Sequence, residues 1–156
     1  MIKERICSYE LSMLLQEKGF KELCRYCYGT AVRHNGKDID EDEEFELKSE
    51  GRADEIEYIK GGVLHDLYYD NDKSFGKDVC AAPTHQTACD WLREIYHICI
   101  TIYPDKEKGF EAVFYDIESD VEITLQSFGV YGYHIFENSY GEVVEAALKY
   151  SLENLI

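Results

Sequence analysis

The pattern of apolar residues in the second half of the chain constrains its fold most strongly. Apolar residues at helical spacing predict a helix over 84–97, and a capping box formed by Ser139 and Glu142 marks the start of another helix. Segments rich in β-branched and aromatic residues predict three strands between these helices, over 98–103, 110–117 and 121–128. A helix, a three-stranded antiparallel meander and a helix are typical of a two-layer α+β domain, so we predict this fold for residues 84–156.

The preceding residues, 1–83, show weaker patterns around one clear helix. That helix is predicted over 8–18, with Gly19 as its left-handed stop and Phe20 placed to pack back on the last turn. Strand-like composition over 24–32, followed by Asn-Gly, predicts part of a hairpin, because this dipeptide tolerates the positive φ angles of a tight turn. We expect residues 1–83 and 84–156 to form one compact unit.

An acidic run over residues 38–46 follows the hairpin turn. Its like charges repel one another, which predicts a solvated loop or an exposed edge. Four alternating side chains resemble the ligands of a calcium loop: Asp38, Asp40, Asp42 and Glu44. Glu43 stands where such a loop needs glycine, and Ser49 stands where it needs a bidentate glutamate, so an irregular acidic segment is the better interpretation.

The charge of the chain limits its partners. Of 156 residues, 32 are Asp or Glu and 16 are Lys or Arg, which gives a net charge of −16. Phosphate binding relies on Lys and Arg, so direct binding of nucleic acid or an anionic membrane is disfavoured.

The first residues lack the apolar run of a signal peptide, and the sequence contains no long apolar stretch. We therefore expect a cytoplasmic protein, and because the common nucleotide-binding motifs are absent we expect no cofactor.

The six cysteines raise the question of a metal or thiol site. Cys24 and Cys27 form a single CxxC, which His85 and Cys89 could complete as a tetrahedral zinc set if the fold gathers them. The same residues could serve a thiol-dependent enzyme. A lone CxxC without its second pair is more often a pair of packed thiols, and no nucleotide-binding, hydrolase or zinc-protease motif is present, so we assign no catalytic residue.

Thirteen tyrosines suggest an interaction surface. Tyrosine is enriched at protein interfaces because it combines a large apolar area with a polar tip. Tyr131 and Tyr133, beside two glycines, are the candidate exposed contacts, and Asp40, Asp42 and Glu44 are the candidate acidic contacts. A homodimer through this surface or a free sheet edge is a further expectation.

Two resemblances add to these patterns. The order of elements over 84–156 resembles the double-stranded-RNA-binding domain, and the segment from Ser139 to Lys149 is similar to the last helix of that domain. That family grips phosphates with a lysine-rich helix start. Here the matching positions are Tyr140, Gly141, Val143 and Val144, so the resemblance implies the layout without RNA binding.

The second resemblance rests on three segments of the chain: 8–20, 82–94 and 139–150. Together they resemble small proteins of gut anaerobic bacteria and their prophages. The resemblance implies a cytoplasmic protein associated with a mobile element and adds no catalytic residue. We therefore predict a non-enzymatic acidic interaction protein that binds a protein partner, basic or nucleic-acid-binding in character. The alternative is a zinc-binding or thiol-dependent enzyme that uses Cys24, Cys27, His85 and Cys89.

Overall fold

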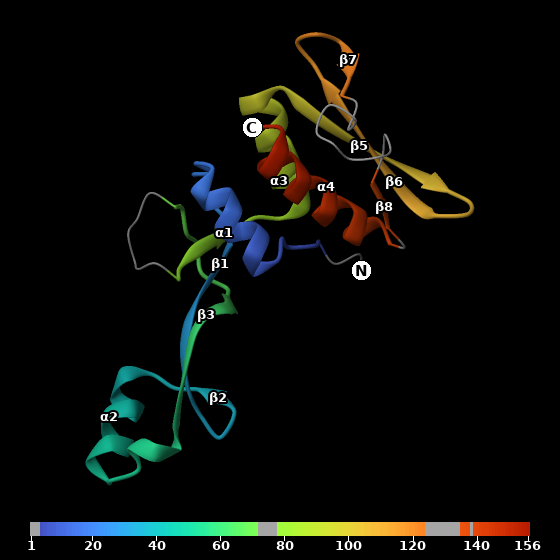
Figure 1. Cartoon of the computed structure of the whole chain (residues 1–156). Coiled ribbons are helices and arrows are strands. Elements are labelled where there is room, and N and C mark those ends of the chain that lie inside the picture. The colour runs from blue at the N-terminus through green and yellow to red at the C-terminus, as the bar shows by residue number, and fades with distance from the viewer. Residues whose placement is uncertain (1–3, 72–77, 124–134, 138) are drawn as a thin grey trace. The chain divides into compact units, whose positions relative to one another are not determined.

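A computed structural model describes residues 4–71, 78–123, 135–137 and 139–156 (Figure 1). The chain divides into two compact units. Unit 1 consists of Met1–Phe20 and Pro83–Ile156, and unit 2 consists of Lys21–Ala82. The junction after residue 82 lies next to the predicted boundary, but the first twenty residues belong with the C-terminal half. The reason is burial, because Leu11, Leu15 and Phe20 lie in the core of unit 1.

Unit 1 has the α+β architecture predicted for the C-terminal half. Its elements are α1 (Tyr9–Glu17), α3 (His85–Tyr96), β5 (Ile98–Asp105), β6 (Gly109–Asp116), β7 (Val121–Glu122), β8 (Ile135–Glu137) and α4 (Tyr140–Asn154). Strands β5, β6 and β7 form an antiparallel meander, and β8 pairs with the opposite end of β6 from β7. The strand predicted over 121–128 is described only at its start, because residues 124–134 lie outside the described part of the chain.

The core of unit 1 forms around α4, which contacts β5, β6, β8, α1 and α3 (Figure 1). Five apolar side chains of α4 are buried: Val143, Val144, Ala147, Leu148 and Leu152. Trp91 of α3 packs edge-on against Phe20, with 5.5 Å between the ring centroids. Each helix that the structure describes is too short or too polar to traverse a lipid bilayer.

Helix α1 ends as predicted. Gly19 has a φ of 92°, and its N–H donates to the carbonyl of Gln16, while the N–H of Phe20 donates to the carbonyl of Leu15. This pair of hydrogen bonds is the Schellman motif, which satisfies carbonyls that the helix leaves without partners. The side chain of Phe20 is fully buried, so the motif also anchors the helix to the core.

Unit 2 is a second antiparallel sheet with one helix. Its elements are β1 (Tyr26–His34), β2 (Lys37–Asp38), α2 (Glu41–Ser49), the short 3-10 helix η1 (Ala53–Glu55), β3 (Ile56–His65) and β4 (Cys80–Ala82). Asn35 and Gly36 have φ angles of 52° and 75°, which confirms the predicted tight turn. The return strand β2 is only two residues long, and the main partner of β1 is β3, which lies beyond α2 in the sequence.

The acidic run was wrongly predicted as a loop, since most of it forms α2. Asp40 caps this helix: its carboxylate accepts the N–H of Glu43, and the carboxylate of Glu43 accepts the N–H of Asp40. The acidic residues of the first turn also face the positive end of the helix dipole. These local interactions, together with the ion pair between Lys48 and Glu44, outweigh the repulsion between like charges.

Candidate functional site

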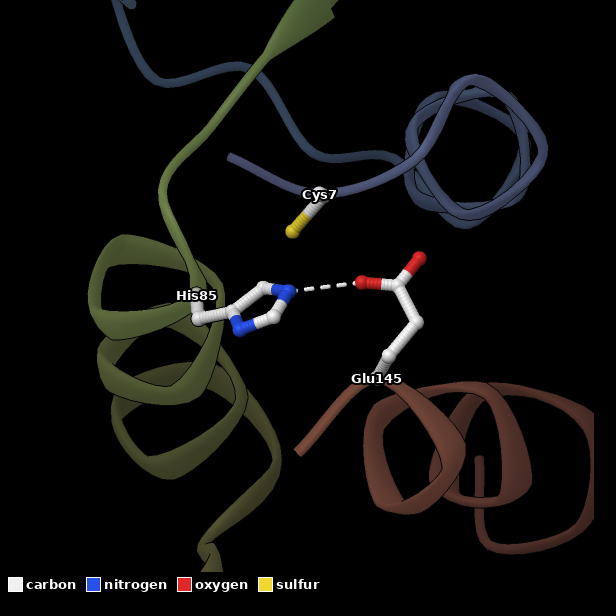
Figure 2. Close-up of side chains that lie close together, drawn as sticks. All are labelled: Cys7, His85 and Glu145. Atoms are coloured by element: carbon white, nitrogen blue, oxygen red, sulfur yellow. Dashed lines mark hydrogen bonds and ion pairs between the residues drawn. The ribbon is translucent and has the colours of Figure 1, made fainter. Parts of the chain in front are cut away.

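Three side chains from three parts of unit 1 meet at one point (Figure 2). Cys7 precedes Ser8, the N-cap of α1; His85 is the first residue of α3; and Glu145 lies on α4. The sulfur, one imidazole nitrogen and one carboxylate oxygen all lie within 4.8 Å of one another. A thiol, an imidazole and a carboxylate are three of the side-chain groups that do most of the acid–base and metal chemistry in proteins.

A short backbone pairing places Cys7 beside His85. Ile6 and Thr84 form an antiparallel bridge, flanked by two hydrogen bonds of 2.9 Å. The N–H of Cys7 donates to the carbonyl of Pro83, and the N–H of His85 donates to the carbonyl of Arg5. This pairing joins residues almost eighty positions apart, so no local sequence pattern contains both side chains.

Glu145 is held by hydrogen bonds through both of its oxygens. Its Oε2 lies 2.6 Å from Nε2 of His85, and its Oε1 accepts the backbone N–H of Ser8 at 3.0 Å. Burial of Glu145 opposes ionisation, but the hydrogen bonds from His85 and Ser8 outweigh it and keep the pKa of the carboxyl below its ordinary value. The carboxylate is therefore ionised at neutral pH.

The site is buried to different depths. Cys7 is fully buried, whereas the side chains of His85 and Glu145 are 13% and 29% exposed. In Figure 2 the sulfur of Cys7 points toward the imidazole–carboxylate pair, and Nδ1 of His85 lies on the far side of the ring. A nucleophile relay needs one imidazole nitrogen on the thiol and the other on the carboxylate. Here Nε2 already bonds Glu145 and the thiol is closed to substrate, so the arrangement does not fit a thiol nucleophile.

His85 and Glu145 also form part of the wall of a groove between α1 and α4, the α1–α4 groove. Its apolar lining consists of Ile6, Leu11, Met13, Leu14 and Ala146. Its carboxylates are Glu10, Glu17, Glu137, Glu142, Glu145 and Glu153, and its permanent cations are Arg5 and Lys149. Arg5 lies against the first turn of α4, in the space where a side chain on Gly141 would sit. The groove therefore combines apolar side chains with an excess of carboxylates over cations.

Known proteins add no residue to this site. No family model, curated protein or solved structure matches the chain. The resemblances to the double-stranded-RNA-binding domain and to proteins of gut anaerobes and prophages therefore stay predictions.

Of the four predicted zinc ligands, the structure brings His85 into this site. Among the described residues, the group that could hold a metal contains His85 but not Cys24, Cys27 or Cys89. Cys24 and Cys27 belong to unit 2. Burial raises the pKa of Cys24 to about 11 and that of Cys89 to about 12, so both thiols stay protonated at neutral pH.

The structure places the three predicted acidic contacts at the start of α2, and the two predicted tyrosines lie outside the described residues. Tyr131 and Tyr133 fall outside the described residues. Asp40 caps α2, and Glu44 accepts a hydrogen bond of 2.6 Å from the hydroxyl of Tyr58 while pairing with Lys48. Asp42 is exposed on the first turn of the same helix. Because these residues lie on a helix, their alternation in sequence does not form a calcium loop.

Proposed function

We propose that unit 1 binds a basic, amphipathic segment of a partner protein in the α1–α4 groove. The observation that carries this proposal is the lining of the groove, where six carboxylates and two permanent cations surround five apolar side chains. The proposal keeps the class predicted from the sequence, a non-enzymatic acidic protein with a basic partner. It moves the contact surface from the acidic run to the groove.

The chemistry of the groove favours a particular kind of segment. Met13 and Leu14 on α1 are only partly buried and can accept apolar side chains of a partner. An amphipathic helix laid into a hydrophobic groove is a recurring form of peptide recognition. Glu10 and Glu17 are exposed along one side, so Lys or Arg on the flanks of that helix would find opposite charge.

A peptide-binding experiment tests the proposal. A fluorescent amphipathic Lys/Leu helix is titrated with the whole 156-residue chain at low salt, next to a peptide of the same composition in scrambled order. We expect the amphipathic peptide to bind more tightly and the affinity to fall as salt rises, since exposed charges are screened.

Matched variants locate the binding. Glu10→Gln combined with Glu17→Gln should weaken binding about fivefold, at roughly 0.5 kcal/mol for each exposed charge. Glu94→Gln combined with Glu107→Gln removes the same charge from exposed positions of unit 1 outside the groove and should leave the affinity unchanged. Equal losses in the two double variants would reduce the effect to net charge and contradict the proposal.

A further inference from the structure

We propose that Cys7, His85 and Glu145 form a zinc site with three protein ligands and a fourth position open to the α1–α4 groove. The proposal goes beyond peptide binding and does not depend on it. It rests on the convergence of three different ligand atoms, supplied by three separate elements, within 4.8 Å of one another.

The ligand set fits zinc by type and by charge. Zinc is bound in proteins by cysteine sulfur, histidine nitrogen and carboxylate oxygen, in four-coordinate tetrahedral sites. Thiolate and carboxylate together supply two negative charges, so a divalent cation gives a neutral centre. Neutrality is important here because Cys7 is fully buried and an uncompensated charge at that depth would be costly.

The required movement of His85 and Glu145 is small. In a tetrahedral zinc site, neighbouring ligand atoms lie about 3.3–3.6 Å apart, as follows from metal–ligand distances of about 2.0–2.3 Å. Nε2 of His85 and Oε2 of Glu145 are 2.6 Å apart and share a proton. They need to separate by less than about 1 Å, and the ion then takes the place of that proton.

The structure also supplies outer contacts that hold the ligands in place. The N–H of Ser8 donates to the second oxygen of Glu145, and Thr84 caps the helix that carries His85. The backbone bonds that join Cys7 to Pro83 and His85 to Arg5 hold two of the ligands in register. Outer contacts of this kind orient ligands and strengthen metal binding in known sites.

The exposure of the ligands indicates where the fourth position opens. Cys7 is closed from solvent, whereas His85 and Glu145 both line the α1–α4 groove. A water molecule or a side chain of the bound segment could therefore complete the coordination from the groove. Three protein ligands with an open fourth position are typical of catalytic zinc sites, whereas structural sites are closed by four protein ligands.

The experiment uses the whole 156-residue chain without a polyhistidine tag, stripped with a chelator and then titrated with Zn²⁺ or Co²⁺. We expect one ion per chain, a thiolate-to-cobalt charge-transfer band in the visible–ultraviolet spectrum, and a higher melting temperature with zinc. Cys7→Ser should abolish the charge-transfer band, and Glu145→Gln should weaken zinc binding at least about tenfold, the lower end of what outer contacts alone cost.

Controls separate this site from the other thiols and from misfolding. Cys24→Ser and Cys89→Ser should keep the stoichiometry and the spectrum, and loss of metal in either would overturn the assignment. If Cys7→Ser does not fold, Glu145→Gln remains informative, because the amide can still accept the N–H of Ser8.

Two results would overturn the proposal and leave His85 and Glu145 as a structural hydrogen bond only. One is failure of the native protein to take up one ion with a thiolate band, and the other is unchanged zinc affinity in Glu145→Gln. Peptide binding by the metal-free protein would be unaffected by that result.

Discussion

At the scale of single residues, the hydrogen bond between His85 and Glu145 joins α3 to α4, and the bond from Ser8 adds the start of α1. One carboxylate thus connects three helices near the point where residues distant in sequence meet. Hydrogen bonds to a charged group contribute more to stability than neutral ones, typically about 1.5–3 kcal/mol. Glu145 should therefore stabilise unit 1 in a way that depends on its ionisation.

We predict that Glu145→Gln lowers the free energy of unfolding of the metal-free protein by about 1–2 kcal/mol at pH 7. The folded-state pKa of Glu145 is lowered from the ordinary value of 4.5. Its contribution is then complete above pH 4.5 and is lost as the pH falls through the folded-state pKa. Urea unfolding at about pH 7 and about pH 3 should measure this loss. The free energies of unfolding of the native protein and the variant should differ less at the lower pH, with the difference shrinking toward zero.

Glu94→Gln on the exposed face of α3 is the matched control, with an expected effect within about 0.5 kcal/mol at either pH. The free energies of unfolding of the native protein and Glu145→Gln could instead differ by the same amount at pH 7 and pH 3. That result would show that shape, and not charge, accounts for the effect of the substitution.

The sequence indicated one member of the candidate site and missed two. His85 stands at the start of a well-marked helix, one turn before Cys89, and this spacing makes it a candidate ligand. Cys7 stands alone just before a helix, and Glu145 lies on a helix with an ordinary polar face. Neither residue belongs to a local pattern that indicates a site. Their proximity depends on the backbone pairing of Ile6 with Thr84 and on the packing of α4, and both are tertiary contacts that no spacing in the sequence encodes.

At the scale of elements, the helix ends were the most predictable features. Ser8, Thr84 and Ser139 each cap a helix with the side-chain oxygen, as their residue types suggest. The positive φ of Gly19 was also foreseeable, since glycine adopts this conformation without strain.

We predict that Gly19→Ala destabilises unit 1 by about 1 kcal/mol, which a urea or thermal unfolding curve would measure. Open space surrounds the position of the added Cβ, so the cost comes from the backbone conformation alone. Gly19→Asn should cost clearly less, because asparagine tolerates left-handed φ angles. Equal losses for the two variants would mean that the φ angle is not the cause.

Helix α2 was missed because the capping box was hidden within the acidic run. Asp40 and Glu43 have the spacing of a capping box, but the carboxylates around them repel one another, and this repulsion favours a loop in a prediction from sequence. The strand that follows was missed for another reason. The main partner of β1 is β3, and the twenty-one residues between them, 35–55, include the whole of α2. Pairing over such a separation leaves no turn signal next to either strand.

We predict that Asp40→Ala destabilises α2 by about 1 kcal/mol, the usual cost of losing an N-cap. Faster amide hydrogen exchange throughout α2 would report the loss. Asp42→Ala is the matched control on the same turn. It should destabilise α2 less, because it weakens only the interaction with the helix dipole and alanine partly offsets that loss by its higher helix propensity. If Asp42→Ala proves the more damaging change, the capping role of Asp40 is contradicted.

At the scale of the whole molecule, the two units differ in how the chain forms them. Unit 2 is one continuous segment, whereas unit 1 combines the first twenty residues with residues 83–156. Acidic groups exceed basic ones in both units, so the net charge of −16 gives no sign of this division. The predicted boundary after residue 83 lies next to the junction between Ala82 and Pro83, but the sequence does not assign the N-terminal helix, since an amphipathic helix does not specify which apolar surface it covers.

We predict that residues 84–156, the domain expected from the sequence, do not fold by themselves. Leu11, Leu15 and Phe20 are buried in unit 1, and burial of a large apolar side chain contributes roughly 1.5–3 kcal/mol. Loss of all three would remove roughly 4.5–9 kcal/mol, which is comparable with the whole stability of a typical domain. The isolated fragment should show poorly dispersed amide signals by NMR and no cooperative thermal transition.

A chain in which a flexible Gly/Ser linker replaces Lys21–Ala82 retains every buried residue of unit 1 and should unfold cooperatively. Cooperative unfolding of residues 84–156 alone would show that α1 is dispensable and would contradict its assignment to the core of unit 1.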